Sequence, residues 1–256
     1  CIMELDENGT IVGHRLAESV IHVNRRTSYT EVAALLAADE SHKEQLQEKY
    51  GDIYPMLLLM AKVSGLLRER RTARGAINFD FPESKIILDE KGTPVEIKPY
   101  ERNDATRMIE DFMLAANETV AEDFFWQEIP FVYRVHEAPD DEKIQRLGVL
   151  IQNFGYNLRG SKTDVHPKVL QSLLEKCDGS PEEALIARLT LRSMKQAKYM
   201  VECEGHFGLA TKYYCHFTSP IRRYPDLQIH RIIKENLRGE LSEKRRGHYS
   251  GILPEV

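Results

Sequence analysis

Apolar and polar residues alternate in several short stretches of the chain, and these stretches predict β-strands. Apolar residues within 1–23 flank Asp6-Glu7-Asn8-Gly9, a strong turn signal, so this segment is predicted to form a β-hairpin. Glu90-Lys91-Gly92 is a second turn signal and separates two of the further strands. The further predicted strands cover residues 77–79, 85–88, 95–97 and 131–135.

Apolar residues that recur every three or four positions predict helices over most of the remaining chain. Ser28 followed by Glu31 is typical of a capping box at a helix start, and a long helix is expected over 40–70. The other predicted helices cover 104–124, 140–154, 166–177, 181–201 and a last segment that begins at Pro220 and ends near Gly239. We therefore expect an α+β fold, with mixed sheet segments and a predominantly helical second half, in one domain of residues 1–256.

Composition narrows the class of protein. With 256 residues, 42% of them hydrophobic, the chain can bury a sizeable core. Neither a bilayer-spanning apolar run nor a signal peptide is visible, so we expect a cytoplasmic protein with no membrane partner. The four cysteines are scattered and the nine histidines lack metal-ligand spacing, which favours a reduced protein with no metal site in this chain.

Charge is unevenly distributed along the chain. The net charge is −5, which argues against a uniformly basic surface for nucleic acid. Residues 206–238 nevertheless hold six lysines and arginines against two acids, and residues 68–74 hold four arginines against one glutamate. A polyanion would be limited to these two places, and the alternative is that both are ordinary solvated faces.

Residues 206–230 combine arginines, aromatic rings and a predicted helix start. Pro220 suits the first turn of a helix, and Thr218 or Ser219 can cap it. Arg222 and Arg223 would then lie near a helix N-terminus, where a phosphate is favoured. Because nucleobases stack on aromatic rings, this segment indicates a nucleic acid held by phosphate and base. The alternative is a capped surface helix with aromatic residues in the core.

The order of these residues resembles a signature of the ribonuclease II/R family. In that family the signature lies in the catalytic RNB domain. The matching positions are His206-Phe207-Gly208-Leu209, Tyr214, the run from Phe217 to Tyr224, Asp226 and His230. Two further strings resemble family segments, one from Arg134 to Asp140 and one from Met108 to Asn117. Cys215 departs from the small residue that is frequent there in the family, and Arg223-Tyr224-Pro225-Asp226 favours the ribonuclease R branch.

The resemblance implies roles for individual residues. Arg222 would be catalytic, binding the scissile phosphate and stabilising charge in the transition state. Glu110 would sense the ribose 2′-hydroxyl, or else lie on a solvated helix surface. The expected RNA contacts are Tyr29, Phe79, Glu110, His206, Arg223 and Tyr224. On pattern alone Phe79 fits a strand core, Tyr29 fits a hydrophobic lid on its helix, and His136-Glu137 is expected to be structural rather than an acid/base pair.

The whole enzyme would, by resemblance, degrade single-stranded RNA processively from the 3′ end and release nucleoside 5′-monophosphates. The family binds Mg²⁺ through an aspartate cluster that this sequence lacks, so we expect the ligands for Mg²⁺ elsewhere in the parent protein. The chain begins with Cys1, and we expect a domain truncated at both ends, inactive alone and joined to S1 and cold-shock RNA-binding domains.

Two other functions are compatible with the residues. One is a non-catalytic RNA-binding or regulatory relative that keeps the RNA channel without the metal site. The other is a hydrolase that uses Ser219 as nucleophile with His216 or His230, although the sequence has no GxSxG motif and Ser219 resembles a cap.

Overall fold

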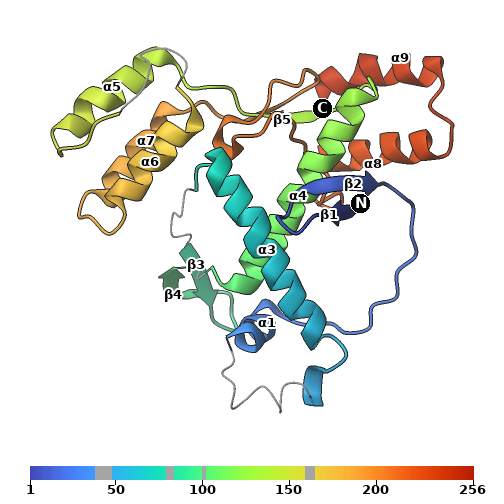
Figure 1. The fold of residues 1–256 in the computed structure, drawn as a ribbon, viewed down its shortest axis with the longest axis horizontal. Helices are drawn as coiled ribbons and strands as arrows, with labels where there is room; N and C mark the ends of the chain where they lie inside the picture. The colour runs from blue at the N-terminus through green and yellow to red at the C-terminus, as the bar shows by residue number, and fades with distance from the viewer. Residues whose placement is uncertain (38–47, 79–83, 100–101, 159–164) are drawn as a thin grey trace. The chain divides into compact units, whose positions relative to one another are not determined.

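The structure is a computed structural model that describes residues 1–37, 48–78, 84–99, 102–158 and 165–256 (Figure 1). The chain divides into two compact units. The first unit consists of Cys1–Ile21, Leu67–Asn78 and Met113–Val256, and the second consists of His22–Leu66 and Phe79–Phe112. Strands and helices are mixed and the second half is mainly helical, so the predicted α+β class is confirmed. The single domain stays a prediction.

Two antiparallel strand pairs belong to the first unit. Strands β1 (Ile2–Leu5) and β2 (Ile11–Arg15) form the predicted hairpin, although it ends at Arg15 rather than at residue 23. Asp6 closes its turn, because one carboxylate oxygen accepts the Asn8 and Thr10 amides at 2.9 and 2.7 Å. Strand β5 (Tyr133–Val135) pairs with β6 (Lys198–Met200).

The helical second half was predicted only in part. Helices α5 (Asp141–Gln152) and α6 (Pro167–Cys177) match the expected segments closely. The helix expected over 181–201 is wrong in its second part: α7 covers only Glu183–Ser193, because the following residues pair with β5 as strand β6. Helix α9 (Glu243–Ile252) was not predicted. The short 3₁₀ helices η1 and η2 cover Phe207–Leu209 and Leu253–Glu255.

Helix α8 (Tyr224–Leu237) begins four residues later than expected. Pro225, not Pro220, lies in its first turn. Residues 220–222 form a turn instead, since the amides of Arg222 and Arg223 both donate to the Ser219 carbonyl at 3.3 and 3.1 Å. The prediction that Thr218 or Ser219 caps this helix is therefore wrong.

The core of the first unit joins α4 (Asp104–Trp126), β5 and α8. The rings of Phe124 and Phe131 stack with centroids 4.7 Å apart, and Ile229 and Ile232 are fully buried beside them. Each such side chain contributes about 1.5–3 kcal/mol when it is removed from water. This packing holds the start of α8 and the residues before it in place.

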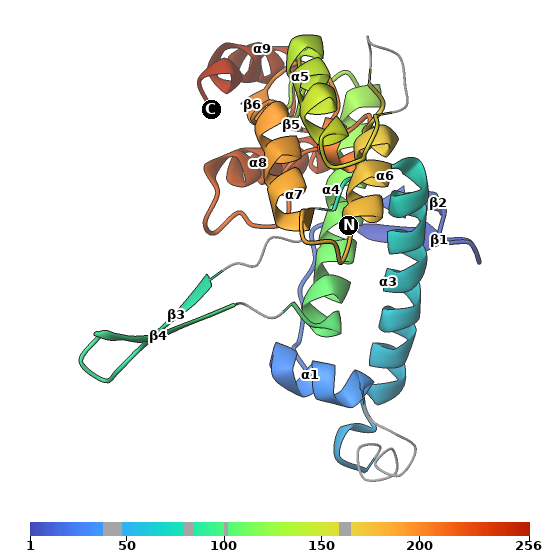
Figure 2. The ribbon, with the colours of Figure 1, turned by 90° about the vertical axis from the view of Figure 1, so that its left-hand side faces the viewer.

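The second unit packs α1 (Tyr29–Leu36) against residues of α3 (Tyr54–Arg74) and α4. The Ser28–Glu31 capping box is present, as predicted. The continuous helix expected over 40–70 is wrong within its described part: residues 48–50 are helical, residues 51–53 form a turn, and α3 begins only at Tyr54 and continues to Arg74. Residues 38–47 lie outside the described residues. Strands β3 (Ser84–Leu88) and β4 (Pro94–Pro99) form the expected antiparallel pair (Figure 2).

The strand expected over 77–79 is wrong for its first two residues. Ile77 belongs to the first unit, and its amide donates to the Gly208 carbonyl at 2.7 Å rather than to a strand partner. Phe79 lies outside the described residues. Within the described ranges, none of the helices combines the length and the apolar character that a membrane crossing requires.

Candidate nucleic-acid interface

Asp226 fixes the turn that leads into α8. It is completely buried, and one of its oxygens accepts both the Ser219 amide at 2.7 Å and the Arg223 guanidinium at 2.8 Å. The Arg223 side chain is also mostly buried, with 21% of its surface exposed. An acid in the first turn of a helix is favoured by the helix dipole. Asp226 therefore ties the turn before the helix to the helix itself.

Asn117 of α4 holds the preceding segment from the other side. Its side-chain oxygen accepts the Phe217 amide at 2.9 Å, and its amide nitrogen lies 3.3 Å from the Tyr214 hydroxyl. The His230 ring of α8 stacks on Phe217 with centroids 4.4 Å apart. Asn117 and His230 both belong to helices that pack in the core. Residues 214–217 are therefore held in one conformation as they lead into the turn.

Arg222 and Tyr224 are the exposed members of this turn. Arg222 is exposed, and its guanidinium lies 3.4 Å from the Ser219 hydroxyl. The Tyr224 ring is 54% exposed, and its hydroxyl accepts from Gln228 one turn further along α8. The structure thus brings three of the predicted residues together, with Arg223 held inside and Arg222 and Tyr224 facing solvent beside a helix N-terminus.

His206 stabilises the backbone around η1. Its ring nitrogen Nδ1 accepts the Leu209 amide at 3.2 Å and so caps η1. Its ring contacts Tyr214 and His136 edge-on, with centroids 5.1 and 4.9 Å apart. Burial, with added repulsion from His136 and Arg134, lowers the pKa of His206 to about 3. The ring is therefore neutral near pH 7, and its contact with RNA stays a prediction.

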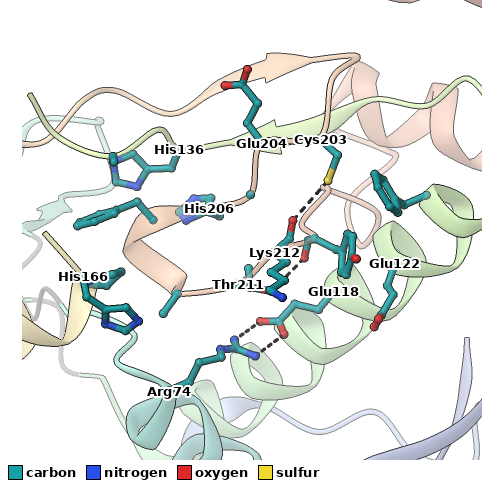
Figure 3. A pocket seen from close by; sticks show the side chains of 17 residues that line it. Arg74, Glu118, Glu122, His136, His166, Cys203, Glu204, His206, Thr211 and Lys212 are labelled. Carbon is teal, nitrogen blue, oxygen red and sulfur yellow. Dashed lines mark hydrogen bonds and ion pairs between the residues drawn. The ribbon is translucent and has the colours of Figure 1, made fainter. Parts of the chain in front are cut away.

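A hollow of about 860 Å³ lies beside this cap in the first unit (Figure 3). His136, His166 and His206 line one part of it, and the bidentate ion pair between Arg74 and Glu118, at 2.9 and 2.7 Å, lies on another. His136 is 7% exposed and accepts the Gly208 amide at 3.2 Å. A side chain at Gly208 would crowd His136, since a Cβ there would lie 3.0 Å from that ring.

The neighbouring His136-Glu137 pair does not form an acid/base couple. Burial lowers the pKa of His136, whereas Glu137 forms ion pairs with Lys195 and Lys198 at 3.6 and 2.8 Å. Asp140 occupies the N-cap position of α5 but makes no side-chain capping bond, and it pairs with Lys143 and Lys195 instead. The contacts therefore agree with a structural role for His136-Glu137, whereas a side-chain cap by Asp140 is wrong.

The two histidines considered as a base for Ser219 are both hydrogen-bonded to other groups. His216 places Nδ1 2.8 Å from the Tyr199 hydroxyl, and His230 places Nε2 2.9 Å from the Phe217 carbonyl. Ser219 contacts Arg222 through its hydroxyl. A nucleophilic serine needs a base within hydrogen-bonding reach, so these contacts argue against the hydrolase alternative.

A second arginine site was missed by the sequence reasoning. Arg134 on β5 places its guanidinium over the Tyr199 ring of β6, 4.7 Å from the centroid. The charges of Arg223, Arg134 and Arg222 add to burial and lower the pKa of His216 to about 3. The available signal was a lone arginine between the buried residues Tyr133 and Val135 of a strand.

Two of the predicted residues, Tyr29 and Glu110, belong to the described part of the second unit. Tyr29 is 51% exposed and lines a hollow of about 750 Å³ with Met56, Met60 and Met108. Glu110 forms an ion pair with Arg102 at 3.3 Å and keeps 39% of its side chain exposed.

Its neighbour Asp111 is 2% exposed and accepts the Ser64 hydroxyl at 2.7 Å. The two adjacent acids thus differ as their helical spacing requires, one accessible and one internal.

Comparison with known proteins gives a consistent result. Residues 1–239 match the RNB domain. The chain is 41% identical over 256 residues to ribonuclease R 1 of Lactococcus lactis and 43% identical over 238 residues to ribonuclease R of Aquifex aeolicus. These alignments cover 100% and 93% of this chain but 31% and 33% of those proteins, so the chain spans about a third of the relatives' length.

Solved structures are similar as well. RNase R of Mycoplasma genitalium in complex with ribose-methylated single-stranded RNA aligns with a TM-score of 0.87 at 29% identity, covering 99% of this chain and 39% of that one. Yeast Ssd1, described as a pseudonuclease, aligns with a TM-score of 0.72 at 20% identity and covers 99% of this chain and 30% of its own, which shows a shared fold.

Replacing Asp226 with alanine should destabilise the protein strongly. The change leaves the Arg223 charge and the Ser219 amide buried without their partner, and removing one member of a buried pair typically costs about 3–5 kcal/mol. Urea unfolding followed by circular dichroism measures the loss. Glu243→Ala is the matched control, an exposed acid in the first turn of α9 that should cost about 0.3–1 kcal/mol. Equal losses would show that Asp226 is not the anchor.

Acid should destabilise the fold through its neutral histidines. His206 and His216 bind protons near pH 3 when folded, whereas the pKa of a free histidine is 6.5. The unfolded chain therefore binds more protons between these values, and stability falls as the pH drops below about 6.5, by up to roughly 1.4 kcal/mol per pH unit for each ring.

His206→Asn keeps a capping oxygen and should reduce this slope between about pH 6.5 and 5, measured by urea unfolding at several pH values. His22→Asn, at an exposed position, is the control. An unchanged slope in His206→Asn would contradict the assignment of this acid sensitivity to His206.

Proposed function

Because this chain belongs to the RNB-domain family and resembles ribonuclease R proteins along its length, we propose that it is part of a 3′–5′ exoribonuclease. The substrate of the whole protein is single-stranded RNA, which it hydrolyses processively to nucleoside 5′-monophosphates. The Mycoplasma genitalium structures with single-stranded and double-stranded RNA support RNA as the partner.

The exposed Arg222 beside the N-terminus of α8 is the observation that carries this proposal. Its planar guanidinium matches two oxygens of a phosphate, and the first amides of α8 favour the same charge. Arg223 is fixed by Asp226 and so positions the turn, while the exposed Tyr224 ring offers a face to a base. In hydrolysis Arg222 binds the scissile phosphate and stabilises the negative charge that develops there.

The second unit would hold the 3′-terminal nucleotides. Tyr29, half-exposed at the start of α1, stacks on a nucleotide, and Phe79 does the same for the last base. Glu110 accepts the ribose 2′-hydroxyl from its accessible place on α4. His206 contacts the RNA from the first unit, and its cap of η1 fixes the neighbouring backbone.

The side chains that the structure describes offer no set of ligands for Mg²⁺. Within residues 1–37, 48–78, 84–99, 102–158 and 165–256, no three His, Cys, Asp or Glu side chains meet in a way that could hold a metal ion. We therefore assign the Mg²⁺ ligands to other parts of the parent protein. The S1 and cold-shock RNA-binding domains and a cytoplasmic location belong to the same proposal.

Arg222→Ala should lower turnover about 10²–10³-fold in the full-length protein while changing RNA affinity much less, because charge stabilisation acts mainly in the transition state. Arg222→Lys should rescue only partly, since a point charge lacks the planar fork. A 5′-labelled single-stranded RNA with Mg²⁺ present gives the rate, and a binding titration gives the affinity. The 256-residue chain alone should yield little product.

Arg192→Ala is the control for this test, because it removes an exposed arginine of α7. Equal losses of rate and affinity in Arg222→Ala would make Arg222 a ground-state binder. RNA binding without any product from the full-length protein would favour the non-catalytic RNA-binding relative.

Glu110→Ala should narrow the preference for RNA over DNA roughly ten- to a hundredfold, because one charge-assisted hydrogen bond to the 2′-hydroxyl is lost. Relative rates on RNA and DNA of one sequence measure it. Asp52→Ala is the matched control, an exposed acid of the same unit that also pairs with an arginine at 3.3 Å. Asp111 is unsuitable since it is buried. An unchanged ratio of the rates on RNA and DNA would show that Glu110 is a surface residue that does not sense the sugar.

A further inference from the structure

Arg134 is held in one orientation by the strand pair β5–β6. Arg134 and Tyr199 lie directly opposite each other in this pair, so their side chains share a face of the ladder. The neighbours Tyr133 and Val135 are buried on the opposite face. The guanidinium rests 4.7 Å from the centroid of the Tyr199 ring, and the residue is half-buried. This is a cation placed on an aromatic platform at the border of the core.

Tyr199 links this cation to the segment that leads into the arginine turn. Its hydroxyl lies 2.8 Å from Nδ1 of His216, which immediately precedes Phe217. Burial raises the pKa of Tyr199, so the hydroxyl keeps its proton while it is hydrogen-bonded to the His216 ring. The platform under Arg134 is therefore tied to the same backbone that Asn117 and Asp226 hold in place.

The arginines around the Tyr199–His216 contact outnumber the carboxylates that pair with them. The guanidinium groups of Arg134, Arg222 and Arg223 all act on His216, and burial keeps that ring neutral near pH 7. Asp226 pairs with Arg223 alone. In the part of the chain that the structure describes, neither Arg134 nor Arg222 forms an ion pair with a carboxylate. Two positive charges therefore lack a carboxylate partner among the described residues.

Like charges that are gathered at a partly buried place repel each other, and an anion offsets this cost. A phosphate satisfies a guanidinium that is already fixed in orientation better than one that must be ordered on binding. Arg134 has this property because its ring platform holds it. Glu137 and Asp140, the acids that follow β5, are already engaged by lysines.

We propose that Arg134, held on the Tyr199 ring, forms a second phosphate subsite that binds an RNA phosphodiester next to the one bound by Arg222. The subsite rests on the proposed function and adds a second contact to it. Arg134 makes the same contact before and during hydrolysis, so it contributes to RNA affinity and leaves the chemical step to Arg222. Tyr199 is a positioning residue that acts through Arg134.

Arg134→Gln in the full-length protein tests the subsite. The variant keeps a polar side chain of similar reach without the charge. The Michaelis constant should rise about tenfold or more while kcat stays within a few-fold, because a uniform binding contact is lost. The slope of log affinity against log salt for single-stranded RNA should decrease by about 0.7, the value for one phosphate contact. Arg134→Lys should restore the slope but not the full affinity.

A substrate series places the contact on the RNA. Each phosphodiester in turn is replaced by a neutral methylphosphonate, and binding is measured with the wild type and with Arg134→Gln. At one linkage, neutralisation should weaken the wild type about tenfold and leave the variant unchanged. Tyr199→Leu, which removes the platform, should reproduce part of the Arg134→Gln effect. Tyr199→Phe keeps the ring and should bind nearly as the wild type does.

Arg192→Gln is the matched control, an exposed arginine on α7 that should leave the slope unchanged. If Arg222→Ala abolishes turnover while Arg134→Gln behaves like Arg192→Gln, the subsite is wrong and the proposed function stands. A loss of stability in Arg134→Gln with an unchanged slope also overturns the subsite, since Arg134 would then serve only to stabilise the fold through its contact with the Tyr199 ring. If the wild type neither binds nor degrades RNA, both proposals fail.

Discussion

The contact of Asp226 with Ser219 and Arg223 is the constraint on which the arginine turn depends. The buried carboxylate takes the Ser219 amide and the Arg223 guanidinium on one oxygen, and both ends of the turn are thereby fixed to the first turn of α8. Because this contact engages the Arg223 guanidinium, Arg222 is the arginine that remains accessible to a ligand. Two adjacent arginines with identical chemistry thus differ in role because one of them has a buried partner.

The sequence predicted the parts of the site that are local. Arg222, Arg223 and Tyr224 follow one another in the chain, and any fold that starts a helix there brings them together. The start itself was wrong by four residues, because Pro220 and Pro225 both satisfy the local rule for a helix start. The choice between them is made by Asp226, whose bond to the Ser219 amide forms only when the turn is folded.

Non-local pairing accounts for the larger errors. Residues 198–200 resemble a continuation of α7 in sequence, yet they form β6 because β5 offers them a partner across more than sixty residues of chain. Arg134 was missed as a site residue for the same reason, since its importance comes from Tyr199, which lies opposite it only after the strands pair. Helix α9 contains Gly247 and Gly251, which weaken its helical pattern, and it is held by the Glu235–Arg245 ion pair with α8.

The residues that carry positive charge at this site differ from the residues that titrate. Burial and neighbouring positive charges keep His206 and His216 neutral down to about pH 3. Positive charge is carried instead by arginines, whose guanidinium groups stay protonated at any physiological pH. The proposed binding of an anion by these arginines is therefore expected to be independent of pH near neutrality, although acid weakens the fold that presents them. A site that used these histidines as its cations would lose its charge as they became buried, so arginines are the residues that can hold a phosphate while packed against this core.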